Sequence, residues 1–232
     1  RLAAPYTNIA VDPDNNLYAS TLDYKTGEIK KLNSVGTNIF HETGSAESFS
    51  INFASLFLSN SYISSTGTAF YGDRRDDEGK DIDSYFVDIA FDDSGIVYAL
   101  DKNTCRVYIY DQEGNLLGTF GSNGIQRGKF VMPSSIAIDS QENLYVLDAN
   151  LGNIQLFRPT KYKQMVCEAI DVYYAGKYTQ AHELWNAVLA VNENYTLARQ
   201  GIGKTYLKQG DYQQSMVEFQ KAGDVKGYSE AF

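Results

Sequence analysis

Between residues 84 and 158, large apolar side chains occupy every second position over several short stretches. In FVDIAFD, residues 86–92, this two-residue period places the large side chains on one face of a β-strand. The same alternation, with β-branched and aromatic residues, returns over 96–101 and 106–111. The residues between these stretches, Asp-Asp-Ser-Gly and Gln-Glu-Gly-Asn, are typical of hairpin turns. The pattern therefore predicts antiparallel strands joined by tight turns, three or four strands to a unit.

This strand pattern occurs three times in the chain. Each copy has an apolar strand containing Ile-Ala, with a tyrosine nine residues after the isoleucine: Ile9 and Tyr18, Ile89 and Tyr98, Ile136 and Tyr145. Repetition at this scale indicates stacked structural units. The interval is 47 residues from Ala90 to Ala137 but 80 residues from Ala10 to Ala90. Residues 41–83 therefore hold either a degenerate copy or a long insertion.

From residue 161 the apolar period changes to about 3.6 residues, which is the period of an α-helix. This change predicts a boundary between a β domain, residues 1–160, and a helical domain, residues 161–232. Glycine ends the first predicted helix at Gly176 and the third at Gly210, 34 residues later. The predicted helices cover 160–176, 177–192, 195–210 and 211–223, and a further helix begins over 226–232.

Composition limits the classes of partner. The chain has 232 residues, is 43% hydrophobic and carries a net charge of −9, all of it within residues 1–160. An acidic domain of this kind argues against binding to nucleic acid or to an anionic membrane surface. No apolar run is long enough to span a bilayer, and no signal-peptide pattern is present. Because the chain begins at Arg1, we expect it to be a fragment.

Few residues in the sequence have the chemistry of a metal or catalytic site. The cysteines, Cys105 and Cys167, fall in different predicted domains, as do the histidines, His41 and His182. Zinc sites need closely grouped ligands, so we predict no metal site, no cofactor and no catalytic residue. The stretch Asp-Pro-Asp-Asn-Asn at 12–16 resembles the start of a calcium loop but lacks its later glycine and glutamate, so we interpret it as a β-turn.

The third strand unit resembles an NHL repeat. The residues that carry the resemblance are Gly121, Gly124, Gly128, Phe130, Pro133, Ile136–Asp139 and Leu144–Val146. The NHL resemblance implies a β-propeller, with four-stranded blades around a central axis. Residues 1–160 then form a partial propeller with three clear blades, and 41–83 form a degenerate fourth blade or an insertion. Loops at the axis openings, such as 101–104 and 148–150, are where such propellers dock partners.

The last blade lacks its outer strand, because Pro159 cannot donate a ladder hydrogen bond. Residues 1–6 supply that strand, or N-terminal blades have been removed, or two chains complete one another. We favour the removal of N-terminal blades. On this interpretation open blade edges remain, and we expect self-association through them.

The helical part resembles tetratricopeptide repeats. The matching residues are Ala169, Ala181 and Trp185 in one repeat, and Gly203, Tyr206, Ser215, Phe219 and Ala222 in the next. Ser215 departs from the repeat pattern, which usually has alanine at that position. The resemblance implies an array of α-hairpins with a concave groove that binds a protein or peptide. By position the groove would be lined by Tyr173, Ile170, Gln200, Lys204 and Lys208. Because Lys204 and Lys208 are four residues apart, they share a helix face, which either is an ordinary solvated face or holds a carboxylate.

The order of the two repeat types resembles the soluble part of clostridial proteins in which a Yip-type membrane region follows. This resemblance implies a non-enzymatic interaction scaffold or sensor. It also implies an extracytoplasmic location, with membrane anchoring through segments outside this chain; a cytoplasmic location is the alternative. The alternative function is an NHL-type hydrolase or lyase whose catalytic blades are absent from this fragment.

Overall fold

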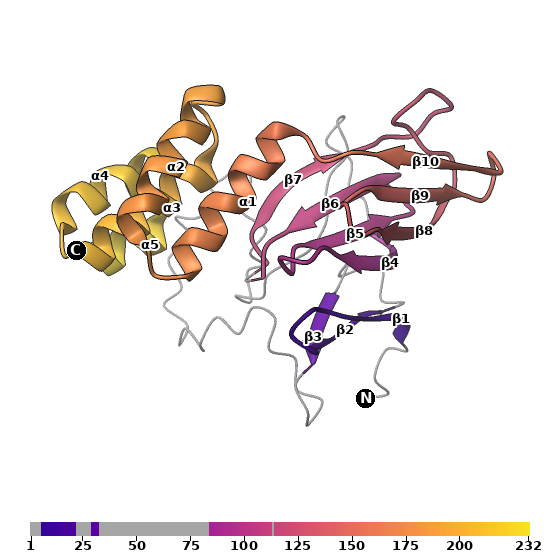
Figure 1. Ribbon diagram of the computed structural model, residues 1–232, viewed down its shortest axis with the longest axis horizontal. Coiled ribbons are helices and arrows are strands. Elements are labelled where there is room, and N and C mark those ends of the chain that lie inside the picture. Colours follow the sequence, from indigo (N-terminus) through magenta and orange to yellow (C-terminus); the bar gives the residue numbers. More distant parts are fainter. Residues whose placement is uncertain (1–5, 22–28, 33–83, 113) are drawn as a thin grey trace. The chain divides into compact units, whose positions relative to one another are not determined.

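The computed structural model describes residues 6–21, 29–32, 84–112 and 114–232. Within these ranges the chain forms three antiparallel β-sheets and five α-helices (Figure 1), so it is a mixed β and α protein. The described residues separate into two compact units. The first ends at Arg158 and holds the three sheets, and we call it the β unit; the second runs from Pro159 to Phe232 and holds the helices, and we call it the helical unit. Residues 41–83, predicted as a degenerate blade or an insertion, lie outside the described residues.

Each sheet is a simple meander in which neighbouring strands are consecutive in the chain. The first contains β1 (Tyr6–Val11), β2 (Leu17–Thr21) and β3 (Ile29–Leu32). The second contains β4 (Phe86–Phe91), β5 (Val97–Asp101), β6 (Arg106–Tyr110) and β7 (Leu116–Phe120). The third contains β8 (Pro133–Ile138), β9 (Leu144–Asp148) and β10 (Asn153–Phe157). Predicted strands 86–92, 96–101 and 106–111 correspond to β4, β5 and β6.

The first strands of the three sheets contact one another in chain order, with β4 touching both β1 and β8. Ile89 on β4 and Ile136 on β8 hold the same place in the repeat, and they are 4% and 6% exposed. The corresponding Ile9 on β1 is 67% exposed. Ile89 belongs to the apolar cluster that the first two sheets share, and burial of such side chains stabilises the packing of one sheet on the next.

The core between the first two sheets is largely aromatic. Tyr18 and Ile29 from the first sheet pack against residues of the second sheet, namely Phe86, Ile89, Val97, Ala99, Tyr108 and Tyr110. The Phe86 and Tyr108 rings meet edge to face, with centroids 5.8 Å apart. Edge-on pairs of this kind suit the aromatic quadrupole, and this pair lies within the second sheet. Between the two sheets, the Tyr18 and Phe91 rings are tilted against each other with centroids 4.6 Å apart.

An aspartate closes each of four hairpin turns. Asp12, Asp92, Asp111 and Asp139 each accept a hydrogen bond from the backbone N–H four residues on, at 2.7, 3.0, 2.8 and 2.9 Å respectively. The third residue after each aspartate has a positive φ: it is Asn15, Gly95, Gly114 and Glu142 in turn. Residues 12–16 thus form a turn of the same kind as the others, and Asp12 also pairs with Lys31 at 3.5 Å.

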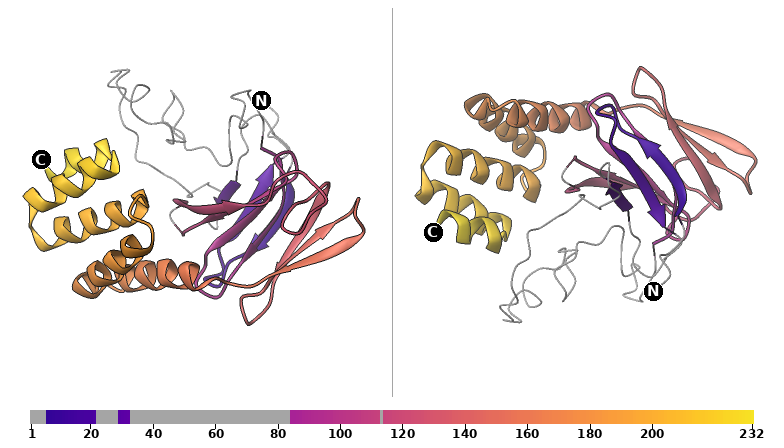
Figure 2. Two further views of the ribbon diagram at one scale, coloured as in Figure 1. Left: turned by 90° about the horizontal axis from the view of Figure 1, so that it is seen from above. Right: turned by 90° about the horizontal axis from the view of Figure 1, so that it is seen from below.

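The second unit consists of helices that follow one another with short turns. They are α1 (Lys161–Tyr174), α2 (Tyr178–Val191), α3 (Thr196–Gln209), α4 (Tyr212–Ala222) and α5 (Val225–Ala231). Each helix packs against the next, and the views of Figure 2 show α1 to α4 side by side in chain order. Side-chain oxygens of Thr160, Asp211 and Asp224 cap α1, α4 and α5 by accepting backbone N–H bonds.

Small residues on α3 allow its neighbours to approach closely. A Cβ at Gly201 would lie 2.4 Å from Trp185 Nε1, and a Cβ at Gly203 would lie 2.9 Å from the Phe219 ring. The Ser215 hydroxyl on α4 donates a 2.8 Å hydrogen bond to the Gly203 carbonyl on α3. Gly201 and Gly203 are therefore packing positions inside a helix. Among the described helices, none has both the length and the apolarity needed to cross a membrane.

Candidate functional site

Three of the five predicted groove residues lie together on α3. Gln200, Lys204 and Lys208 follow at four-residue intervals, so they form a row along one helix face; Gln200 and Lys204 are half-buried and Lys208 is exposed. Tyr173 lies near the end of α1, where its ring contacts Tyr174 and Tyr178 at centroid distances of 5.7 and 5.5 Å. The structure thus groups the polar residues of the prediction and places the tyrosine in an aromatic cluster.

The prediction that Ile170 lines the groove is wrong. Ile170 is only 5% exposed and lies on the buried stripe of α1 with Val166, Cys167 and Ala169. Its counterpart one repeat later is Lys204, which is half-buried. The same repeat position therefore serves the core in one helix and a partly open surface in the other.

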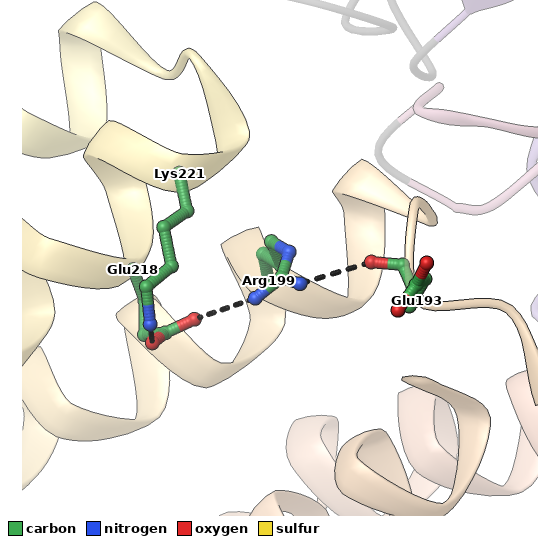
Figure 3. A network of polar contacts seen from close by, with 4 residues as sticks. All are labelled: Glu193, Arg199, Glu218 and Lys221. Carbon is green, nitrogen blue, oxygen red and sulfur yellow. Dashed lines mark hydrogen bonds and ion pairs between the residues drawn. The ribbon is translucent and has the colours of Figure 1, made fainter. Parts of the chain in front are cut away.

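A polar network that the sequence reasoning missed braces α3 against α4 (Figure 3). The Arg199 guanidinium donates to the Glu193 carbonyl at 2.9 Å and pairs with Glu218 Oε2 at 3.5 Å. Lys221 pairs with the other oxygen of Glu218 at 2.5 Å. Because one carboxylate is shared by two cations, the network fixes the turn before α3 relative to α4, and with it the row of Gln200, Lys204 and Lys208.

In the β unit, the carboxylate of Asp88 joins all three sheets. Its Oδ1 accepts from Asn8 Nδ2 at 2.8 Å and from the Ile89 backbone N–H at 2.9 Å. Its Oδ2 accepts from Ser135 Oγ at 2.7 Å and from the Ile136 backbone N–H at 2.9 Å. We call Asp88, Asn8 and Ser135 the Asp88 cluster. Its carboxylate has four donors, which makes the cluster a structural link.

The three residues of the Asp88 cluster are equivalent in the repeat, since each immediately precedes the Ile-Ala pair of its strand. In every sheet the pairing register shifts just before this residue, between Tyr6 and Asn8, Phe86 and Asp88, and Pro133 and Ser135. A bulge re-aims the side chain that follows it. The repeated bulge therefore points one polar side chain from each first strand toward the neighbouring sheet.

The loops after β5 and β9, predicted as docking loops, are organised by buried aspartates. Asp101 Oδ1 accepts backbone N–H bonds from Tyr85 and Asn103 at 2.9 and 2.8 Å. Asp148 is fully buried and accepts backbone N–H bonds from both its own loop and the preceding one. Burial opposes ionisation of Asp148, but the backbone donors outweigh it and hold the pKa of Asp148 below its ordinary value. These carboxylates shape the loops from within.

A pocket of about 510 Å³ lies beside β10 and was not predicted from the sequence. It is lined by Arg127 and Gly128 on one side and by Ile154–Arg158 on the other. The two guanidinium groups give it a positive character. Sequence reasoning overlooked it because the arginines are 31 residues apart in the chain, and only the packing of the loop before β8 brings them to one pocket.

The remaining candidates for chemistry do not form a site among the described residues. No group of three or more His, Cys, Asp or Glu side chains there is arranged to hold a metal ion. His182 packs edge-on against Tyr206 at 4.8 Å, and Cys105 and Cys167 are buried free thiols. Burial raises the pKa of the Cys105 thiol, which leaves it protonated and unreactive. His41 lies outside the described residues.

No protein-family model matches the chain, and no curated protein matches it. Among solved structures, the chain is similar to virginiamycin B lyase from Staphylococcus aureus, in a catalytically inactive variant with quinupristin. The identity is 12%, the TM-score is 0.37, and the match covers 70% of this chain and 44% of that one. A selenomethionine form of the same lyase gives 12% identity and a TM-score of 0.30, covering 69% and 58% of the two chains.

A protein of unknown function from Bacteroides caccae is also similar, at 10% identity and a TM-score of 0.25, with 68% of this chain and 62% of that one covered. In all three cases the chain spans less than two thirds of the other protein. The prediction that this chain is not an enzyme is corrected, since two of the similar structures are of an enzyme. At these identities and TM-scores no activity, substrate or residue role passes from the lyase to this chain.

Proposed function

We propose that this chain is a protein-interaction scaffold or sensor that binds a protein or peptide along the helical unit. In this proposal residues 161–232 are tetratricopeptide hairpins and residues 1–160 are blades of an NHL-type propeller. The binding residues are Gln200, Lys204 and Lys208 on α3, with Tyr173 on α1.

The observation that carries the proposal is the regular repetition of the helix pair. Tyr178 begins α2 and Tyr212 begins α4, 34 residues later. α2 packs against both α1 and α3, and α4 packs against α3 and α5, so each hairpin stacks on the next. Arrays of this type present the first helix of each pair along one extended surface that is suited to binding a polypeptide.

The chemistry of α3 favours a ligand that carries carboxylates. Lys204 and Lys208 lie on one helix face with Gln200 between them and the start of the helix. Two ammonium groups in a row attract an acidic side chain or a chain terminus, while the amide of Gln200 both donates and accepts. The Arg199–Glu218 network holds this face in place, so the ligand would meet a surface that is already organised.

The β unit supports the propeller part of the proposal. Its three meanders contact one another through their first strands, as blades do around an axis. Ile9 on β1 is 67% exposed, which leaves apolar surface on the first sheet for a further blade or a second copy. We propose that the full protein associates through this open blade, and that it is extracytoplasmic and membrane-anchored through segments outside this chain.

Selection of random peptides displayed on phage, followed by fluorescence anisotropy of the selected peptide, tests the groove. We expect acidic peptides to be selected. The double variant Lys204→Gln/Lys208→Gln should bind them about tenfold more weakly, because two charge-assisted contacts are lost.

Lys177→Gln is the matched control, since Lys177 is an exposed lysine of the same unit that makes no capping hydrogen bond. It should bind as the parent chain does. If the double variant binds as tightly as the Lys177→Gln control, the α3 face is not the binding site and the proposal fails.

A further inference from the structure

β10 forms the outer edge of the third sheet. β10 is the last strand of its sheet, and no strand among the described residues pairs with its second edge. β10 is the third strand of its sheet, as β6 is in the second sheet. The second sheet has a fourth strand, β7, which pairs with β6. The third sheet therefore has the geometry to accept a fourth strand.

The pocket beside β10 follows this edge. Five consecutive residues, Ile154–Arg158, line it. Successive side chains of a strand point to opposite faces of the sheet. A pocket that is lined by both sets must lie along the edge of the strand rather than over one face. Its opposite wall is formed by Arg127 and Gly128.

The walls of the pocket are held by specific contacts. The Gln155 side chain accepts from the Gly128 N–H at 2.9 Å and donates to the Lys129 carbonyl at 2.7 Å, which ties the loop to the strand. The Phe157 ring packs against Phe120 and Phe130, with centroids 4.8 and 5.9 Å away. The width between loop and strand is thus set before any ligand arrives.

The chemistry of the pocket is apolar and cationic. Ile154 and Leu156, on one face, are 64% and 47% exposed. Arg127 and Arg158 are exposed, and neither forms an ion pair within the part of the chain that the structure describes. In a chain with a net charge of −9, these two guanidinium groups are a local site for negative charge.

We propose that the edge of β10 binds an extended acidic peptide segment, which adds to the third sheet as its fourth strand. Main-chain hydrogen bonds to the edge of β10 that no described strand pairs with supply affinity, and the apolar side chains of the segment cover Ile154 and Leu156. Its carboxylates meet Arg127 and Arg158 in charge-assisted hydrogen bonds. This site is separate from the α3 face and does not depend on the proposed function.

The probe is a fluorescein-labelled peptide of alternating valine and glutamate, titrated with the whole chain at low ionic strength and followed by anisotropy. Two companion peptides share its length, one with lysine for glutamate and one methylated at every second backbone nitrogen. We expect the acidic peptide alone to bind. Arg127→Gln/Arg158→Gln should weaken that binding by about tenfold.

Lys102→Gln removes an exposed charge elsewhere in the same unit and should leave binding unchanged. Lys204→Gln/Lys208→Gln should also leave it unchanged, which separates this site from the α3 face. Equal binding of the N-methylated peptide would overturn strand addition, and equal binding of the lysine peptide would overturn the role of the arginines. If no peptide binds, and light scattering shows a dimer that Arg127→Gln/Arg158→Gln dissociates, the edge is occupied by a second copy and the proposal is wrong.

Discussion

Asp88 offers the sharpest test of how the sheets are held together. The substitution Asp88→Ala removes one carboxylate that serves donors on three strands: Asn8 on β1, Ile89 on its own strand, and Ser135 with Ile136 on β8. The side chains of Asn8 and Ser135 can turn to water when the carboxylate is gone. The backbone N–H groups of Ile89 and Ile136 cannot, since these residues are 4% and 6% exposed.

The expected cost follows from those two amides. A buried donor left without a partner costs about 1–3 kcal/mol, so two of them cost about 2–6 kcal/mol. Removal of a partly buried charge returns some desolvation energy, which offsets part of that loss. We therefore expect Asp88→Ala to lower the free energy of unfolding of the β unit by about 2–4 kcal/mol.

Native-state hydrogen exchange followed by mass spectrometry measures this loss in the strands concerned. Amides of β4 and β8 should exchange about 30- to 1,000-fold faster in the variant, if exchange reports the opening equilibrium. Trp185 is the single tryptophan of the chain and lies in α2, so its fluorescence during urea unfolding reports on the helical unit. That transition should not move.

Asp93→Ala is the matched control, because Asp93 is an exposed aspartate beside the same strand. It should change stability by no more than about 0.5 kcal/mol. Exchange in β4 and β8 that is as slow in Asp88→Ala as in Asp93→Ala would refute the view that the Asp88 cluster holds the sheets together. Equal destabilisation of the helical unit would refute the assignment of the effect to the β unit.

Three further predictions follow from other contacts. Gly201→Ala places a Cβ 2.4 Å from Trp185 Nε1, so despite the better helix propensity of alanine it should lower stability by about 1–2 kcal/mol and shift tryptophan emission to the red; an unchanged spectrum and urea midpoint would contradict this. The hydrogen bond from the Asn143 side chain lowers the pKa of Asp139 to about 2, below the unfolded value of about 3.9, so the stabilisation from its carboxylate is present above pH about 4 and is lost as pH falls through 2. The stability gap between the parent chain and Asp139→Asn should therefore close on acidification from pH 7 to pH 2, and a constant gap in urea midpoints would argue against it. Cys105 and Cys167 are buried, so both thiols should react with Ellman's reagent much more slowly in the folded chain than in urea, and equal rates would show that they are accessible.

The elements of this protein are largely readable from its sequence because they depend on local pattern. Alternation of apolar residues predicted β4, β5 and β6, and the 3.6-residue period predicted the helices, including the short α5. The stretches Asp-Asp-Ser-Gly, Gln-Glu-Gly-Asn and residues 12–16 predicted three of the hairpin turns, although the position that is glycine after Asp92 and Asp111 is Asn15 and Glu142 in the other two turns. Each of these signals acts within a few residues of the chain, so no knowledge of distant packing was needed.

The contacts of the site residues, by contrast, could not be predicted from local sequence pattern. Asp88 occupies a polar position in an alternating strand, and by pattern alone it is a solvent-facing residue; its partners lie 80 and 47 residues away in the sequence. Ile170 and Lys204 hold the same repeat position, yet only the packing of α1 decides that the first is buried. The Arg199–Glu218 pair joins two helices whose apolar patterns do not encode it.

By itself, the sequence determined which segments become strands, turns and helices, because periodicity and turn chemistry are properties of neighbouring residues. The tertiary structure alone decided which polar side chains meet across the sheets, and it alone brought Arg127 and Arg158 to one pocket beside β10. Hydrogen bonds and ion pairs require atoms to approach within about 3 Å, and only the packed chain brings distant residues that close.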